Sequence, residues 1–185
     1  VIENEVLNRP VSKEEVQKCI KKLKNNKACG YDNVINEFIK CSADNMVDIY
    51  VNLFNLVLTT GVVPSDWVIG IIKPLYKNKG SRKEVDNYRG ITLLSCVGKL
   101  FTYILNERLE YFVETNNLLA EEQTGFRSGY STCDHLFTLN FIVSRYLHKS
   151  KRLYCAFVDY RKAFDTVDRI SLWKKLISIN VNGNV

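Results

Sequence analysis

The stretch Leu153-Tyr154-Cys155-Ala156-Phe157-Val158-Asp159-Tyr160-Arg161-Lys162-Ala163-Phe164-Asp165 is the part of the sequence that decides its fold class. Residues 153–158 form an apolar run that is too short for a helix and suits a buried strand, with Asp159 at its end. Residues 136–147 and 172–179, on either side, carry apolar side chains at helical spacing. A strand between helices, in a chain with further helices and strands, predicts a mixed α+β fold.

The residues before position 65 have the pattern of helices. Ser12-Lys13-Glu14-Glu15 is a capping box, and the helix that it opens should end near Asn25. Residues 32–57 carry apolar side chains at helical spacing into a longer helix, which Gly61 and Pro64 stop. We therefore expect the N-terminal third of the chain to be α-helical.

Extended structure is expected next. Residues 67–76 are rich in β-branched and aromatic side chains, and we predict a strand there that ends at or near Pro74. Residues 91–94 predict a second, short extended segment. Ser95 is placed to cap a helix over residues 97–109. The middle of the chain therefore supplies the first β-structure of the fold.

The composition is that of an ordinary globular protein, with 46% apolar and 25% charged residues. No apolar run approaches the roughly 18–20 residues that span a bilayer, so we expect no membrane partner. The six cysteines form no C-x-x-C pair, which favours a reduced intracellular chain over a zinc or disulfide framework. The sequence starts at Val1 without a signal-peptide pattern, and we expect it to begin inside a longer reading frame.

The net charge of +6 is modest, but the basic residues are grouped. Two groups stand out: Lys18, Lys21, Lys22, Lys24 and Lys27, and then Lys73, Lys77, Lys79, Arg82, Lys83 and Arg89. Either group fits a solvated face, and either fits the border of a channel for a polyanion. Charge alone leaves both readings open.

Asp159 has two possible uses at the end of a buried strand. Its carboxylate can cap the next turn, or it can offer a hard oxygen ligand to Mg²⁺ or Mn²⁺ in a cleft. Nucleotidyl transfer uses two such ions about 3.5–4 Å apart, and strand ends can hold carboxylates rigidly for them. The position of Asp159 alone allows both uses.

The segment Ala156-Phe157-Val158-Asp159-Tyr160-Arg161-Lys162-Ala163-Phe164-Asp165-Thr166-Val167-Asp168 closely resembles motif A of reverse transcriptases from non-LTR (LINE-like) retrotransposons. The resemblance implies that Asp159 is catalytic and a Mg²⁺ ligand, and that the ring of Phe164 excludes the ribose 2′-hydroxyl by a clash. Spacing alone would instead place Phe164 in a core. Asp165 is expected to cap or orient the following segment. The residues implied to line the triphosphate with their backbone are Tyr160, Arg161 and Lys162.

Two nearby segments resemble the fingers motif of the same family. They are Ile71-Ile72-Lys73-Pro74-Leu75-Tyr76-Lys77-Asn78-Lys79-Gly80 and Asn87-Tyr88-Arg89-Gly90-Ile91-Thr92-Leu93-Leu94-Ser95. The resemblance implies a β-hairpin that folds over the incoming nucleotide, with Lys77 or Lys79 and Arg89 at its phosphates. Lys73 is assigned to the same nucleotide-binding set. Gly90 and Thr92 stand where the family usually has proline and serine.

Two loops complete the resemblance. Glu121-Glu122-Gln123-Thr124-Gly125-Phe126-Arg127-Ser128-Gly129-Tyr130-Ser131-Thr132 is similar to the family's Gln-x-Gly-Phe-Arg block, which is implied to lie against the template. The alternative is an ordinary glycine-containing loop. The residues expected at nucleic acid are Gln123, Gly125, Phe126 and Arg127. Leu23-Lys24-Asn25-Asn26-Lys27-Ala28-Cys29-Gly30-Tyr31-Asp32 resembles a further family block, from which Cys29, Tyr31 and Asn33 depart.

Together these segments imply the fingers and partial palm of a right-hand polymerase within one reverse transcriptase domain. Residues 1–150 would be fingers and flanking helices, and residues 151–185 would start the palm. The implied activity is RNA-directed DNA polymerisation with an RNA template, a DNA primer and dNTP, in a protein of the nucleus and cytoplasm. The family's paired aspartates are absent from the sequence, so we expect the isolated segment to be inactive and the remaining metal ligands to lie beyond Val185.

Two other readings remain. The segment can be a decayed or repurposed fragment that binds nucleic acid without polymerase activity. It can also belong to another polymerase of the same fold, such as a group II intron maturase or a telomerase. The pattern Asp-x-x-x-Ala-Phe-Asp-x-Val, together with Asn-Tyr-Arg, favours the LINE-like branch.

Overall fold

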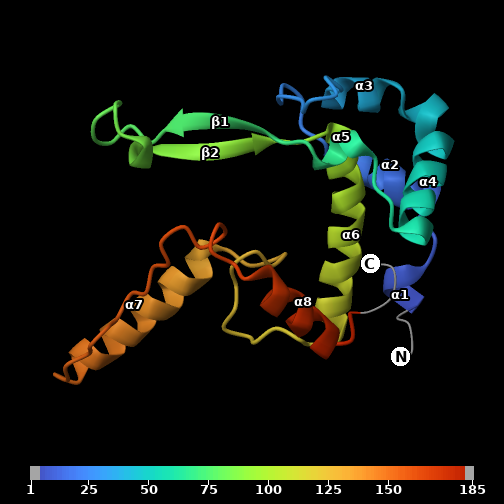
Figure 1. Ribbon diagram of the computed structural model, residues 1–185. Helices are drawn as coiled ribbons and strands as arrows, with labels where there is room; N and C mark the ends of the chain where they lie inside the picture. The colour runs from blue at the N-terminus through green and yellow to red at the C-terminus, as the bar shows by residue number, and fades with distance from the viewer. Residues whose placement is uncertain (1–4, 182–185) are drawn as a thin grey trace. The chain divides into compact units, whose positions relative to one another are not determined.

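The computed structural model describes residues 5–181, which form two compact units. Among the described residues, the first unit runs to Phe112 and takes in Asn180 and Val181, and the second unit is Val113–Ile179. The first unit holds five short to medium helices, most of a sixth and a two-stranded sheet, and the second holds two further helices (Figure 1). Helices combined with a small sheet agree with the predicted α+β class.

The helices of the first unit follow the signals in the sequence. They are α1 Glu5–Asn8, α2 Lys13–Lys22, α3 Asn36–Cys41, α4 Ala43–Thr60, α5 Ser65–Val68 and most of α6 Cys96–Thr115. The capping box is present, because the Ser12 hydroxyl accepts from the Glu15 N–H and the Glu15 carboxylate accepts from the Ser12 N–H. Gly61 ends α4 in the left-handed conformation, with φ of 69°. The single helix predicted for residues 32–57 is instead two helices, separated at Ser42.

The hydrophobic core of the first unit lies among α2, α3, α4 and α6. Phe54 and Leu100 are fully buried, and the Phe101 ring lies 5.3 Å from that of Phe54. The Trp67 ring covers this pair, with its centroid 5.7 Å from that of Phe101. Each such buried apolar side chain contributes about 1.5–3 kcal/mol. The first unit therefore has a core of its own.

A buried arginine fastens the N-terminal segment to α6. The Arg108 side chain is only 2% exposed and makes a bidentate pair with Glu15, with Nε–Oε1 and NH2–Oε2 distances of 2.9 and 2.8 Å. Its other N–H groups donate to the carbonyls of Leu7, Arg9 and Pro10. Burial alone would raise the pKa of Glu15, but the hydrogen bonds from Arg108 and the Ser12 N–H lower it from 4.5 to about 2.

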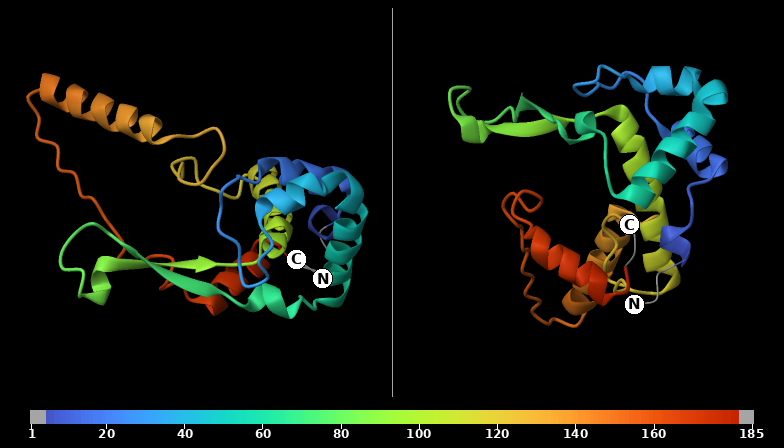
Figure 2. Two further views of the ribbon diagram at one scale, coloured as in Figure 1. Left: turned by 90° about the horizontal axis from the view of Figure 1, so that it is seen from above. Right: turned by 45° about the vertical axis from the view of Figure 1, so that its right-hand side comes forward.

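The sheet of the first unit is a hairpin that runs away from the helices, as both views of Figure 2 show. Strand β1 (Ile71–Tyr76) pairs antiparallel with β2 (Tyr88–Leu93), and the 3₁₀ helix η1 (Val85–Asn87) precedes β2. The prediction that the first strand ends near Pro74 is wrong by two residues, since Pro74 pairs with Gly90 inside the ladder. Each strand of a two-stranded sheet has an open edge, where a missing N–H is tolerated.

The second unit holds α7 (Thr132–His148) and α8 (Arg169–Ser178). Ser131 and Asp134 form a capping box at the start of α7. No residue of either helix is buried, and large apolar side chains such as Phe137 and Trp173 are exposed. Among residues 5–181, no helix is both long enough and apolar enough to cross a membrane.

Candidate functional site

The chain around Asp159 is extended but forms no strand. The buried strand predicted for residues 153–158 is wrong, because residues 151–160 pair with no other segment and Phe157 and Val158 are 84% and 78% exposed. A strand needs a neighbour for its backbone N–H and C=O groups, and the described residues of the second unit contain no other strand. Asp159 is accordingly an exposed carboxylate in this unit.

A tight turn follows Asp159. Lys162 has a positive φ of 52°, and its carbonyl accepts hydrogen bonds from the N–H groups of Asp165 and Thr166 at 2.9 and 3.2 Å. Asp165 was expected to cap or orient the following segment; the capping role is wrong, because Asp168 caps α8 instead. The Asp168 carboxylate accepts from the Ile170 N–H at 3.1 Å and from the Ser171 hydroxyl at 2.6 Å, and the latter bond chiefly lowers the pKa of Asp168. Tyr160, Arg161 and Lys162, predicted to line a triphosphate, are exposed in and before this turn.

The structure brings two predicted site residues of the second unit together. The Phe126 and Phe164 rings meet edge to face, with centroids 5.9 Å apart and planes at 89°. They are 93% and 80% exposed. Phe126 also has a positive φ of 64°, a conformation that is strained for a bulky side chain. An exposed aromatic pair on a strained backbone is the arrangement expected of a contact surface rather than a core.

Arg127, which the resemblance places at nucleic acid, is occupied by its own loop. Its guanidinium donates to both carboxylate oxygens of Glu114 at 2.9 and 2.8 Å, and to the carbonyls of Ala120 and Gln123. It also lies 4.7 Å from the Tyr130 ring centroid. The hydrogen bond from Arg127 lowers the pKa of Glu114. Arg127 therefore holds the loop to the end of α6, and no sequence pattern pointed to its partner Glu114.

The rest of this loop is held locally. The Gln123 amide nitrogen donates to the Gly125 carbonyl at 3.2 Å. A Cβ on Gly125 would lie 3.5 Å from that nitrogen, which is ordinary contact. The loop over residues 116–131 is thus ordered by its own hydrogen bonds, with Phe126 at its surface.

The hairpin of the first unit carries the other predicted cations. Because side chains alternate along a strand and Lys73 pairs with Ile91 while Leu75 pairs with Arg89, Lys73 and Arg89 lie on one face. The ring pair Tyr76 and Tyr88, with centroids 5.4 Å apart, lies on the other.

The hairpin tip is closed by internal contacts. Lys77 donates to the Asp86 carbonyl at 2.6 Å, and Arg82 lies over the Tyr76 ring at 5.2 Å. Lys77 is therefore partly occupied in closing the tip. Lys73, Lys79 and Arg89 are exposed and make no ion pair within residues 5–181. The structure thus separates the structural cations of the hairpin from those available to a ligand.

The described residues do not complete a metal site. Within residues 5–181, no three side chains of His, Cys, Asp or Glu gather as ligands for a metal ion. Mg²⁺ takes six oxygen ligands in near-octahedral geometry and usually keeps several waters. Asp159 offers one carboxylate toward such a site, and the described part of the chain supplies no partner carboxylates for it.

The loop over residues 24–33 is fixed against the start of α6. A Cβ on Gly30 would lie 2.4 Å from the Ser95 nitrogen and 2.5 Å from the Leu94 carbonyl carbon, so only glycine fits there. Asn33 has a positive φ of 58°, a conformation that asparagine tolerates. The loop is therefore well anchored despite its departures from the family block.

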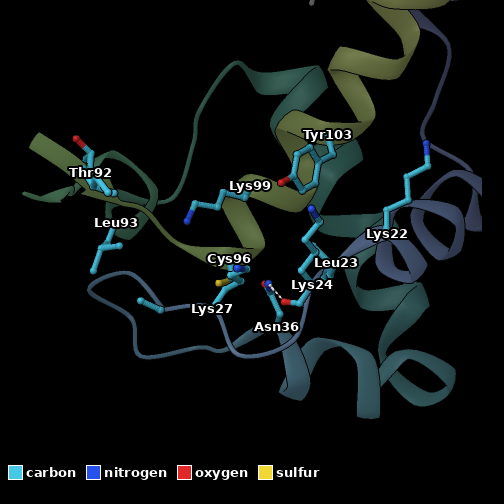
Figure 3. Close-up of a pocket in the computed structure, with 12 residues that line it drawn as sticks. Lys22, Leu23, Lys24, Lys27, Asn36, Thr92, Leu93, Cys96, Lys99 and Tyr103 are labelled. Carbon is cyan, nitrogen blue, oxygen red and sulfur yellow. Dashed lines mark hydrogen bonds between the residues drawn. The ribbon is translucent and has the colours of Figure 1, made fainter. Parts of the chain in front are cut away.

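Beside this loop lies a cavity of about 360 Å³ that the sequence did not reveal. Figure 3 shows it between the loop, the end of β2 and the first turns of α6. Its lining includes Lys22, Lys24, Lys27 and Lys99 and no acidic side chain. The grouping of lysines before residue 28 was the available signal, but Lys99 comes from a distant part of the sequence.

Comparisons with known proteins bear on both units. A family model described as reverse transcriptase (RNA-dependent DNA polymerase) matches residues 77–184, which is more than half of the chain. The probable RNA-directed DNA polymerase from transposon X-element of Drosophila melanogaster is 32% identical over 166 residues, covering 88% of this chain and 18% of that protein. The RNA-directed DNA polymerase from mobile element jockey of the same species is 31% identical over 158 residues, covering 85% and 17%.

A more distant relative is the retrovirus-related Pol polyprotein from type-1 retrotransposable element R2 of Popillia japonica. It is 29% identical over 174 residues, covering 94% of this chain and 23% of that protein. The chain therefore spans between 17% and 23% of the length of these three curated relatives.

Proposed function

The chain belongs to the reverse transcriptase family, and on that premise we propose that it is the fingers and first palm segment of an RNA-directed DNA polymerase encoded by a non-LTR retrotransposon. The proposed division is fingers and flanking helices over residues 1–150 and the start of the palm over residues 151–185. The parent protein would copy an RNA template by extending a DNA primer with dNTP. The observation that carries the proposal is the pair of exposed cations, Lys73 and Arg89, on one face of the hairpin.

On this proposal the hairpin binds nucleotide phosphates. Lys73 and Arg89 share a face, and neither is neutralised by a carboxylate of the described residues. An arginine fork can hold two phosphate oxygens at once, and a lysine adds a mobile point charge. Lys79, in the tip, is the further available cation. Lys77 takes a lesser part, because its ammonium group already donates to the Asp86 carbonyl.

In the second unit, Asp159 is the residue proposed to ligate Mg²⁺, or Mn²⁺, in the parent protein. The proposed task of Phe164 is to lie beneath the sugar and exclude the 2′-hydroxyl by a steric clash. Its exposure and its edge-to-face contact with Phe126 support a surface role, since a core aromatic would be covered. Phe126 then orients Phe164, and Arg127 positions the loop that carries Phe126. Gln123 and Gly125 remain proposed contacts to template.

Primer extension by the parent reading frame tests the proposal. Asp159→Asn should abolish extension, and Lys73→Ala with Arg89→Ala should raise the KM for dNTP at least tenfold. Lys13→Ala is the matched control, because Lys13 is an exposed cation in a surface pair with Asp48. Phe164→Val should admit ribonucleotides. Extension that survives Asp159→Asn would overturn the assignment of that residue.

A second outcome would favour the alternative function. If the parent frame binds RNA but extends no primer under any metal condition, the protein is a repurposed nucleic-acid-binding fragment. The isolated 185 residues should not extend a primer, since no Asp-Asp pair occurs among them and Asp159 has no partner carboxylate in residues 5–181. Extension by the isolated chain would contradict this expectation.

A further inference from the structure

The lysine-lined cavity of the first unit, defined by Lys24, Lys27, Lys99 and Tyr103, has no part in the function proposed above. None of these residues lies in the hairpin strands or in the motifs assigned to the nucleotide and the template. They come from the loop over residues 24–33 and from α6, and Figure 3 shows Lys24, Lys99 and Tyr103 around one opening. Two segments far apart in the sequence thus build one site.

Three of the four lysines that line the cavity make no ion pair. Lys22 and Lys18 both pair with Glu107, which shares its single negative charge between these two members of the N-terminal lysine group. Lys24, Lys27 and Lys99 make no ion pair within residues 5–181. Like charges held near one another are unfavourable unless an anion comes between them. The cavity is therefore suited to a negatively charged ligand.

The lysines are carried on a rigid frame. The Asn36 amide donates to the Lys24 carbonyl at 2.8 Å, and the Asn26 N–H donates to the Glu37 carboxylate at 2.5 Å. Gly30 packs directly on the backbone at the start of α6. Little backbone entropy would be lost on binding, because the loop is already fixed in place.

The end of α6 adds to the positive potential. Cys96, the first residue of this helix, lines the cavity, and the helix runs to Thr115. The N-terminus of a long helix carries partial positive charge from its aligned peptide dipoles. The Ser95 hydroxyl accepts one of the first N–H groups, that of Gly98 at 3.2 Å, so the lysines rather than free N–H groups provide most of the attraction.

The available groups select phosphate as the ligand chemistry. Lysine ammonium groups bind phosphate oxygens as point charges, and the Tyr103 hydroxyl can donate to the same oxygens. The Tyr103 ring is 48% exposed and offers a surface on which a base can stack. A ring beside several lysines is the combination found where proteins follow a single-stranded backbone.

We propose that this cavity binds a phosphodiester of a single-stranded polynucleotide, with Lys24, Lys27 and Lys99 at the phosphate and Tyr103 against the adjacent base. A free polyphosphate has the same charged groups but no neighbouring base for the ring. The site thus gives the first unit a nucleic-acid contact that depends on neither the hairpin cations Lys73 and Arg89 nor Asp159.

The test is a fluorescence anisotropy titration of a labelled single-stranded oligouridylate with the 185-residue chain, in EDTA and over a series of salt concentrations. The variant carries Lys24→Gln, Lys27→Gln and Lys99→Gln. The matched control has the same charge change at exposed lysines outside the cavity: Lys13→Gln, Lys21→Gln and Lys174→Gln. Circular dichroism verifies that both variants fold like the parent chain.

The cavity variant should bind at least tenfold more weakly than the control variant at 0.1 M salt. The slope of log K against log salt should fall by about 0.7, the value for the one phosphate that the cavity lysines no longer neutralise. Tyr103→Ala should weaken binding further than Tyr103→Phe, which keeps the ring. Equal affinities and slopes for the two triple variants would overturn the proposal.

Inorganic tripolyphosphate separates the two sources of phosphate. If the cavity variant no longer binds tripolyphosphate but retains oligouridylate binding, the site takes a free polyphosphate and the polynucleotide assignment is wrong. The titration requires neither metal nor polymerase activity. Its result is therefore independent of the primer-extension test of Asp159.

Discussion

Replacing Arg108 with methionine should destabilise the first unit by about 3–5 kcal/mol, the range for removing one partner of a buried ion pair. The Arg108 side chain is 2% exposed, and its N–H groups make five hydrogen bonds to Glu15 and to the carbonyls of residues 7, 9 and 10. Methionine fills similar space but removes all five of these hydrogen bonds, so Glu15 keeps only those from the Ser12 N–H and Arg9. Lysine keeps the charge but cannot reproduce the planar fork, so Arg108→Lys should also destabilise the unit.

The pKa of Glu15 gives a second measure of the same interaction. A fall from 4.5 to about 2 corresponds to roughly 3.4 kcal/mol at 1.36 kcal/mol per pH unit. Because the folded-state pKa is the lower one, this stability is fully present above pH 4.5 and is lost as the pH falls toward 2. Linkage predicts a loss of about 1.4 kcal/mol from this carboxylate between pH 6 and pH 3.5.

Urea unfolding measured by tryptophan fluorescence tests both values. All of these proteins carry Trp173→Phe, which leaves Trp67 as the only tryptophan. Because Trp67 packs on Phe101 in the core, its fluorescence reports on the unfolding of the first unit. The gap in unfolding free energy between this parent and its Glu15→Gln form should narrow by about 1.4 kcal/mol from pH 6 to pH 3.5. An Arg108→Met protein within 1 kcal/mol of the parent at pH 6 would refute the assignment, as would parallel pH profiles for Glu15→Gln and the parent.

Two further predictions concern glycines and cysteines. Gly30→Ala should destabilise the first unit by about 1–3 kcal/mol or more, since its Cβ would meet the Ser95 nitrogen at 2.4 Å. Gly61 has a φ of 69° but no atom within 4 Å of a Cβ added there. Gly61→Ala should therefore lower the free energy of unfolding, measured in urea, by only about 1–2 kcal/mol. Burial raises the pKa of Cys19 to about 11 and also raises that of Cys96. A thiol reagent at pH 8 should therefore label both only on unfolding; rapid labelling of either in the native chain would contradict the packing. The exposed thiols that should react first are Cys41, Cys133 and Cys155.

The features of the fold that depend on local sequence were predicted well. The capping box at Ser12 and the stop at Gly61 both occur as expected, because each depends on residues within one helical turn. The helix over residues 136–147 was predicted from apolar spacing, and α7 contains it. The break at Ser42 was missed, since the apolar period continues through it.

Contacts between residues far apart in the chain could not be predicted from the sequence. Arg108 and Glu15 are 93 residues apart, and no local pattern joins them. Residues 153–158 have the composition of a strand, but strand formation depends on a hydrogen-bonding neighbour, which the described second unit lacks. The composition of a segment indicates how well it fits into a sheet, but it does not show whether a neighbouring strand is present.

The candidate site shows the same division between residue type and use. Motif spacing placed the Arg127 side chain at nucleic acid, but the guanidinium is bound to Glu114 and to its own loop. Phe126 and Phe164 were predicted as site residues from two different motifs, and in the structure their rings are in contact. Side-chain partners, which decide whether a polar group is available, follow from the tertiary structure alone.

The basic residues divide into two functional groups once their partners are known. Arg108, Arg127 and Lys22 have carboxylate partners, so replacing them should chiefly change stability or loop position. Many cations make no ion pair within residues 5–181, and among them are those of the hairpin face and of the cavity: Lys73, Arg89, Lys24, Lys27 and Lys99. A carboxylate partner in the folded state already supplies the negative charge that a phosphate would bring, so a phosphate must compete for a paired cation but not for a free one. Ion pairing, more than the net charge of +6, therefore decides which cations a polyanion can reach without competition.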